Sequence, residues 1–222
     1  MGKKQTQHDD LVQLQNELGS LMKRIPMWVW WVGVLIFGAF IFQYTFTAMT
    51  TYTYEGLTFT RIAEGDLTLH HHAYFIDPTT RYHLYLRQDP RENEIPVTGD
   101  LLFTSRRIYF SIDVEGLASC EDSTLGVGTL TAFLNNNKLK VKPSTPDPKK
   151  AYELNLTQAD CDSHPEDTVI LLRNSSESSV YKEHTKCFIL NVHNCSVMPV
   201  IEKFMVETVA DRRALGADSL RP

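Results

Sequence analysis

The sequence predicts a mainly β exported domain, antiparallel and sandwich-like with a C-terminal helix, on a single N-terminal transmembrane α-helix. Three observations lead to this fold class: a long uncharged apolar segment near the N-terminus, alternating apolar and polar residues after it, and apolar residues at helical spacing near the C-terminus. The expected parts are a cytoplasmic amphipathic arm at 1–26, a transmembrane signal-anchor helix at 27–49, a juxtamembrane segment at 50–65, a β-rich lumenal or extracellular domain at 66–213 and a flexible tail at 214–222.

The N-terminal arm has the pattern of a short amphipathic helix. Asp10 and Gln13 have the spacing of a capping box, which satisfies free amide groups at the start of a helix. Leucines then recur at intervals of three, four and three residues, as on an a/d seam, at Leu11, Leu14, Leu18 and Leu21. They are candidate partner-binding residues for a helix or a membrane surface. The alternative is a helix that continues loosely out of the membrane with its leucines near the headgroups.

Residues 27–49 form the candidate transmembrane helix. These 23 residues contain no Asp, Glu, Lys, Arg or His. A helix of this length reaches about 34 Å, enough to cross a hydrocarbon core of about 30 Å. A cleaved signal peptide has a shorter apolar region, and a soluble buried helix is rarely apolar on all sides. Aromatic residues also flank both ends, as in an interfacial belt, at Trp28, Trp30, Trp31, Tyr44, Tyr52 and Tyr54.

The distribution of basic residues predicts the orientation of this helix. Four basic residues precede it, whereas residues 50–66 contain only Arg61. Because Lys and Arg are retained on the cytoplasmic side, the N-terminus is expected inside and the C-terminal domain outside or in a lumen, at the plasma membrane or in the endomembrane system. Within the helix, Gln43 is a candidate contact with another membrane helix; the alternative is that it reaches water at the outer interface.

Net charge and cysteine content indicate which partners and which compartment suit the exported region. It holds 18 basic and 24 acidic residues, a net charge of −6, which argues against nucleic acid as a partner. All four cysteines lie in it, as an oxidising compartment would permit. We expect two disulfides among Cys120, Cys161, Cys187 and Cys195, with all three pairings open; the alternative is four buried free thiols. Three sequons add candidate glycosylation sites at Asn155, Asn174 and Asn194.

Beyond the juxtamembrane segment, the apolar pattern takes a period of two. Residues 67–75, 81–87 and 107–114 alternate in this way, which predicts antiparallel strands with one buried and one solvated face. On the first strand one alternating set is Leu67, Leu69, His71, Ala73 and Phe75. Later strands are expected at 125–134, 138–141, 168–172 and 188–192. Several short strands separated by turn signals favour a β-sandwich.

Two further segments complete the expected domain. The Pro-rich stretch 142–150 is expected to be a loop that joins no ladder. The last element is predicted to be a helix with one apolar face, formed by Ile201, Phe204, Met205 and Val209. Alternating strand–helix units of the kind that build parallel sheets are not expected.

The histidines at 70–72 raise the question of a metal site. On a strand, His70 and His72 share a face and can chelate zinc or copper, and His83 on a neighbouring strand would add a third ligand. No further zinc signature accompanies them, so the preferred interpretation is solvated histidines and no metal. No phosphate loop, nucleophile elbow or metalloprotease helix motif occurs, and the sequence predicts neither a catalytic residue nor a cofactor.

Together these observations favour a non-catalytic role. We expect a single-pass type II membrane glycoprotein that acts as an accessory or assembly subunit, with the lipid bilayer and a multi-span or other membrane protein as partners. The alternative is a cell-surface or lumenal module that binds a soluble ligand. A small membrane-tethered metal-dependent enzyme that uses the histidine cluster is a third and weaker hypothesis.

Overall fold

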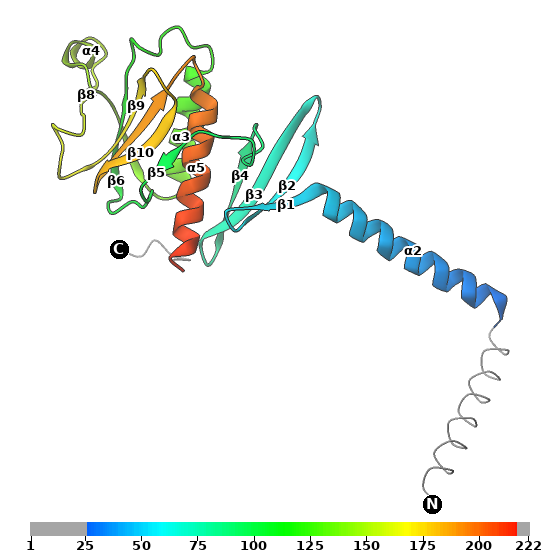
Figure 1. Ribbon diagram of the computed structural model, residues 1–222. Coiled ribbons are helices and arrows are strands. Elements are labelled where there is room, and N and C mark those ends of the chain that lie inside the picture. Colours follow the sequence, from blue (N-terminus) through cyan, green and yellow to red (C-terminus); the bar gives the residue numbers. More distant parts are fainter. Residues whose placement is uncertain (1–25, 217–222) are drawn as a thin grey trace, which may run out of the picture. The chain divides into compact units, whose positions relative to one another are not determined.

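The computed structural model describes residues 26–216, and the chain divides into two compact units at the bond between Thr50 and Thr51 (Figure 1). Helix α2, Met27–Thr50, is the described part of the first unit. The described part of the second unit, residues 51–216, contains two β-sheets and three helices. The protein is thus mostly β beyond the apolar helix, with a helix at its C-terminal end.

Helix α2 is apolar around its whole circumference. Its segment Met27–Thr45 has a mean hydropathy of 1.6, and no residue of that window is buried in the structure. The Thr45 hydroxyl donates to the carbonyls of Ile41 (2.9 Å) and Phe42 (3.0 Å). A helix hydrogen bond of this kind satisfies a hydroxyl without water. Within residues 26–216, α2 is the one helix long and apolar enough to cross a membrane.

The smaller sheet is an antiparallel meander. Its four strands follow one another in the sheet as in the sequence: β1 Thr51–Tyr54, β2 Leu57–Glu64, β3 Leu67–Asp77 and β4 Thr80–Leu86. Glu55 and Gly56 join β1 to β2 with positive φ angles of 46° and 73°, as a two-residue hairpin turn requires. Residues 51–64, expected as a juxtamembrane segment, therefore belong to the compact domain.

The larger sheet has seven strands in the order β5-β10-β11-β9-β6-β7-β8. Their bounds are β5 Val97–Thr98, β6 Arg107–Ile112, β7 Lys140–Thr145, β8 Thr157–Gln158, β9 Thr168–Asn174, β10 Ser179–His184 and β11 Cys187–Val192. Only the β10–β11 pair is antiparallel among the pairs of this sheet; every other neighbouring pair is parallel. The larger sheet therefore differs from the antiparallel sandwich that the sequence predicts.

Three helices accompany the larger sheet: α3 Ser123–Asn136, α4 Pro148–Glu153 and α5 Val197–Ala214. The order β6-α3-β7-α4-β8 consists of strand–helix–strand units, contrary to the expectation that such units are absent. Helix α5 lies between the two sheets: it contacts β10 and β11 on one side, and its Glu207 accepts a hydrogen bond from Tyr54 of β1 on the other (Figure 1). A helical layer thus separates the sheets.

The prediction of a strand at 125–134 was wrong because tertiary packing outweighs local propensity there. Val127, Thr129 and Thr131 favour strands, yet the segment is helical in α3. Leu130, Phe133 and Leu134 face the core at helical spacing. Gly126 permits the close approach of α5, since a Cβ there would lie 2.7 Å from Val197 Cγ1. The fold therefore needs a glycine at a position that lowers helix propensity.

The prediction of a loop at 142–150 was also wrong. Its first half continues β7, and its second half forms α4 behind the N-cap Asp147, whose carboxylate accepts the amide protons of Lys149 and Lys150. Pro143 sits in β7 opposite Phe110 of β6. Strand β8 pairs only with Ser144 and Thr145, so β7 is an edge at Pro143, where a missing amide proton is tolerated.

The larger sheet is buried on both faces. One face packs on α3 and α5 through Ile108, Phe110, Phe188 and Leu190, among others. The other face carries a smaller cluster around the disulfide Cys161–Cys187. A second disulfide, Cys120–Cys195, joins the loop after β6 to the loop after β11. The two expected disulfides are therefore present, and the structure selects one of the three possible pairings.

Candidate functional site

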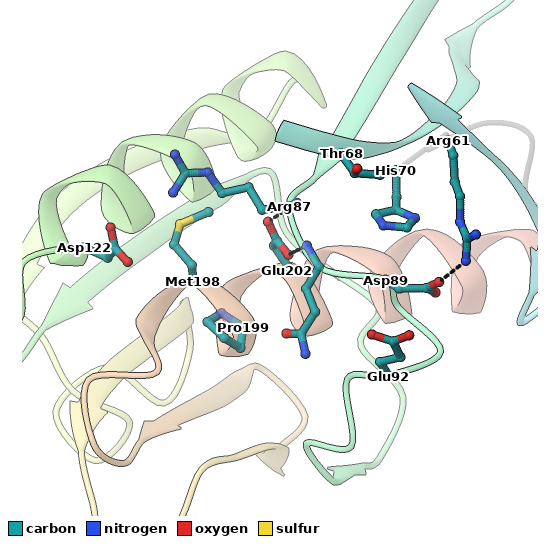
Figure 2. A pocket seen from close by; sticks show the side chains of 11 residues that line it. Arg61, Thr68, His70, Arg87, Asp89, Glu92, Asp122, Met198, Pro199 and Glu202 are labelled. Atoms are coloured by element: carbon teal, nitrogen blue, oxygen red, sulfur yellow. Dashed lines mark hydrogen bonds and ion pairs between the residues drawn. The ribbon is translucent and has the colours of Figure 1, made fainter. Parts of the chain in front are cut away.

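A polar cavity of about 630 Å³ opens between the smaller sheet and α5 (Figure 2). Strands β2 and β3, the segment after β4 and the first turns of α5 all contribute to it. Its lining is Arg61, Thr68, His70, Arg87, Gln88, Asp89, Glu92, Asp122, Met198, Pro199 and Glu202. Its size is within the range of small-molecule sites, and its walls are richer in charge than most such sites.

Asp89 is the centre of an ion-pair network on one side of this cavity. Its side chain is 4% exposed and accepts from Arg61 Nη2 at 3.1 Å and from Arg91 Nη2 at 2.7 Å. Figure 2 shows Arg61 extending from β2 to this carboxylate. The hydrogen bonds from Arg91 hold the pKa of Asp89 well below its usual range. Asp89 is therefore an anion matched by two guanidinium groups.

The aromatic ring of Tyr52 connects this network to His70. The Arg91 guanidinium lies 3.9 Å from the ring centroid of Tyr52, as in a cation–π contact. The Tyr52 hydroxyl is 2.6 Å from Nδ1 of His70, which is 5% exposed. Burial raises the pKa of Tyr52, with Asp89 adding to the effect, and burial lowers the pKa of His70. At neutral pH the pair is thus a neutral phenol beside a neutral imidazole.

Glu202 closes the floor of the cavity from α5. Its side chain is buried and accepts the backbone amide protons of Arg87 (2.7 Å) and Gln88 (3.1 Å), directly after β4. Burial raises the pKa of Glu202 in spite of these two hydrogen bonds. The carboxylate therefore ties the end of the smaller sheet to α5.

The lining of the cavity has an acidic balance. Four carboxyl groups face two guanidinium groups around it, namely Asp89, Glu92, Asp122 and Glu202 against Arg61 and Arg87. The most buried of these groups, Asp89 and Glu202, already have protein partners. Electrostatics would favour a cationic ligand over an anion, while the bonded groups stabilise the fold.

The predicted histidine set is not brought together. His70 and His72 point to the buried side of β3, where His70 meets Tyr52 and the His72 Nδ1 lies 2.8 Å from the carbonyl oxygen of Thr58. His83 lies on the opposite face and pairs with His71, with 2.8 Å between Nε2 of His71 and Nδ1 of His83. The expectation that His70 and His72 are solvated was also wrong, because both are less than 7% exposed.

The contact between His71 and His83 was not predicted from the sequence. These residues stack with Tyr85 on the outer face of the sheet, at a centroid distance of 4.8 Å between His71 and Tyr85. The signal that would have found the pair is register: β3 and β4 place Ala73 opposite His83 and His71 opposite Tyr85, so the two histidines are diagonal neighbours. A pair of imidazoles offers two metal ligands, fewer than a structural zinc site needs.

Among the described residues, one group has the ligand types and spacing of a metal site: Cys161, Glu183 and Cys187. The two sulfur atoms are joined in a disulfide, and Glu183 Oε2 lies 3.6 Å from Cys187 Sγ. A metal binds the thiolate form of cysteine, so the disulfide and a metal site exclude each other. The oxidised state fits a structural cross-link.

The carboxyl ends of β6 and β9 are the place where an open parallel sheet usually binds ligands, since the strand order reverses between them. Here the loop after β6 packs against the end of β9: a Cβ at Gly116 would lie 2.9 Å from the Cβ of Asn174 and even closer to Asp113. The disulfide Cys120–Cys195 ties this loop down. The usual ligand position is thus engaged in structural contacts.

The remaining predicted sites are placed as follows. All three sequon asparagines, Asn155, Asn174 and Asn194, have exposed side chains, as glycosylation requires. Gln43 lies on the exposed surface of α2. The arm leucines Leu11, Leu14, Leu18 and Leu21 lie outside the described residues.

No protein-family model, curated protein or solved structure matches this chain.

Proposed function

We propose that this protein is a single-pass type II membrane glycoprotein that acts as a non-catalytic accessory or assembly subunit of a membrane protein complex. In this proposal α2 is the anchor, the N-terminus is cytoplasmic and the two-sheet domain lies outside the cell or in a lumen. The exported domain meets the partner next to the bilayer. The partner is a multi-span or other membrane protein.

One observation carries the proposal: the apolar helix continues into the folded domain without a linker. Helix α2 ends at Thr50, and β1 begins at Thr51. Consecutive Cα atoms are about 3.8 Å apart, so no linker separates the helix from the first strand. A direct junction between anchor and domain suits a domain that binds a neighbouring protein in the same membrane. Binding of distant ligands would favour a long flexible linker.

The state of the ionisable groups supports a non-catalytic role. Asp89 is paired with two arginines, Glu202 accepts two backbone amide protons, and His70 is bonded to Tyr52. Each of these groups serves to hold elements of the domain together. A general base or nucleophile needs access to its substrate, which such contacts reduce.

Co-purification of the full chain tests this proposal. A mild detergent extract should contain a membrane protein in fixed stoichiometry with the chain. Gln43→Leu should reduce its recovery about fivefold, since an interhelical hydrogen bond in a bilayer contributes about 1 kcal/mol. Leu14→Ala with Leu18→Ala should add an independent loss if the arm also binds. Ile36→Leu, an apolar exchange in the same helix, is the control and should leave recovery unchanged.

A chain that is extracted alone would contradict the subunit proposal. Equal recovery of every companion with the triple variant (Gln43→Leu, Leu14→Ala and Leu18→Ala) and with the control would exclude the helix and the arm as contacts and leave the exported domain as the binding surface.

A second candidate function, binding of a soluble ligand, is favoured by the polar cavity. Its acidic balance would suit a small organic cation, such as a polyamine. Calorimetric titration of the full chain with spermidine tests this function. Saturable binding that Glu92→Gln weakens would support it, because Glu92 lines the cavity. No heat, or binding unaffected by this substitution, would remove it.

A further inference from the structure

The β2–β3 hairpin projects beyond the rest of the smaller sheet. Strand β1 pairs with β2 only as far as Thr51 opposite Thr60, and β4 pairs with β3 only as far as Leu86 opposite His70. Residues 61–69, here called the ribbon, extend past both partners as a two-stranded hairpin. Every residue in 61–68 is exposed. A two-stranded ribbon without a packed face is marginally stable in water.

One face of the ribbon is apolar except for Glu64 at its tip. Ile62 lies opposite Leu69, and Leu67 follows next to them on the same face. Ile62 is 37% exposed and Leu67 is 53% exposed. Arg61, Ala63 and Thr68 occupy the other face. At the tip Glu64 pairs with Leu67 and shares its face, and Asp66 lies in the turn. The ribbon is therefore amphipathic, with an apolar side and a charged tip.

The ribbon extends from the end of the smaller sheet that is joined to α2. The sheet begins at Thr51, which is bonded to the last residue of α2. Strand β2 runs antiparallel to β1, so it returns toward Thr51 and continues past it. Four residues, 61–64, extend beyond that point and reach about 13 Å. The ribbon thus projects from the same end of the sheet at which the anchor joins.

The lengths of helix and ribbon are compatible with contact to the bilayer. The apolar window of α2 ends at Thr45, six residues before Thr51. Six helical residues rise about 9 Å, which is less than the reach of the ribbon. We infer that the apolar face of the ribbon rests in the interfacial layer of the bilayer that holds α2, as a second contact beside the anchor. This inference rests on the proposed membrane anchor.

The charges of the ribbon define the kind of lipid surface. Glu64 and Asp66 cannot enter hydrocarbon as anions, so they limit the ribbon to headgroup depth. Zwitterionic headgroups offer a cationic group to these carboxylates. An anionic surface would repel the tip. The ribbon therefore suits a zwitterionic leaflet.

Nitroxide labels on the full chain, reconstituted in phosphatidylcholine vesicles, test this inference. All four native cysteines are in disulfides, so introduced cysteines take the label. Leu67→Cys reports on the ribbon. Thr79→Cys is the matched control, because Thr79 is exposed in the turn at the other end of β3. Ile36→Cys reports on the anchor. Collision of each label with oxygen, which enters lipid, is compared with collision with a water-soluble nickel chelate.

The expected result is preferential oxygen collision at 36 and 67 and preferential nickel collision at 79. Adding phosphatidylglycerol at about a third of the lipid should shift the label at 67 toward nickel. A label at 67 that matches 79 while 36 remains in lipid would overturn the inference and leave the anchor standing. A label at 67 shielded from both reagents would also overturn it, since protein would then cover the ribbon. A nickel-accessible label at 36 would overturn the anchor itself.

Discussion

The two sheets of the domain that follows α2 share an apolar core and differ in the contacts added to it. In the larger sheet every residue of β11 is buried, and β9 and β11 contribute mostly aliphatic side chains to the core. In the smaller sheet β3 buries His70, His72 and Ile76 and leaves Phe75 exposed. The smaller sheet also contributes apolar residues to the main core, namely Leu57, Phe59, Leu84 and Leu86. Hydrogen bonds between its strands and α5 add to this packing. The same chain therefore contains an apolar core and a polar seam.

The two sheets also differ in their disulfide cross-links. Both disulfides connect segments in and around the larger sheet, while residues 51–97 contain no cysteine. Beside its apolar residues, the smaller sheet has the polar contacts of Tyr54, of Tyr74 and of the backbone after β4. We therefore expect the two sheets to respond separately to reduction, to loss of a polar contact and to pH.

Removal of the disulfides should have the largest effect. In the chain-entropy model the cross-link Cys120–Cys195, with a separation of 75 residues, stabilises by about 4.5 kcal/mol. Cys161–Cys187, with a separation of 26, stabilises by about 3.5 kcal/mol in the same model. Guanidinium unfolding of the two double Cys→Ala variants measures both values. Equal losses, or a larger loss for the shorter loop, would contradict the dependence on loop length.

Loss of the Glu202 contact should have an intermediate effect. Glu202→Ala leaves the amide protons of Arg87 and Gln88 without their acceptor, which should lower the free energy of unfolding by about 2–3 kcal/mol. Glu202→Gln keeps an acceptor oxygen and should cost about 1 kcal/mol. Hydrogen exchange at residues 87 and 88 is the local readout. The polar seam would be disproved if both variants kept native protection at these two amides.

The smallest effect should come from histidine titration. Burial lowers the pKa of His72 from 6.5, so below that pH the unfolded chain binds more protons than the folded one. Stability contributed by the neutral imidazole is present above pH 6.5 and is lost as pH falls through the folded pKa. The slope is at most about 1.4 kcal/mol per pH unit for one histidine. Hydrogen exchange between pH 7.5 and 5 should show amides of β2–β4 losing protection before those of β9 and β11.

Two variants isolate this histidine contribution. Glu202 has a raised pKa and thus contributes stability that is lost as pH rises, a slope of opposite sign. The titration is therefore best measured with Glu202→Gln as background. His72→Asn retains a donor for the Thr58 carbonyl but does not titrate, so its slope should be shallower. An unchanged slope would assign the pH dependence to other groups.

The sequence predicted well those features that depend on local pattern. The apolar helix, the strands at 107–114, 168–172 and 188–192 and the apolar face of α5 follow from periodicity, and all are present. Oxidised cysteines followed from their placement after the apolar segment. Disulfide pairing did not, because it depends on which loops the fold brings together.

The misread features depend on tertiary contacts. Gly126 and three β-branched residues made the sequence of α3 resemble that of a strand. The need for glycine at this position comes from the close packing against Val197, which the sequence does not reveal. On β3 the more apolar of the two alternating sets, which includes Leu67 and Phe75, lies on the more exposed face. The buried face carries His70 and His72, which are satisfied by Tyr52 and the Thr58 carbonyl, partners that only the register supplies. The polar cavity could not be predicted for the same reason.

Protease protection in sealed vesicles tests the proposed anchor and exported domain most directly. Vesicles with the cytoplasmic face outward are treated with protease, with and without detergent, and the fragments are separated without reductant. The prediction is that protease shortens the chain only at its N-terminal arm and leaves a fragment that contains both disulfides, and that this fragment is cleaved once detergent opens the vesicles. Cleavage within residues 51–216 in intact vesicles would contradict the proposed orientation. Release of the whole chain from the vesicles by alkaline carbonate, which removes peripheral proteins, would contradict the proposed anchor.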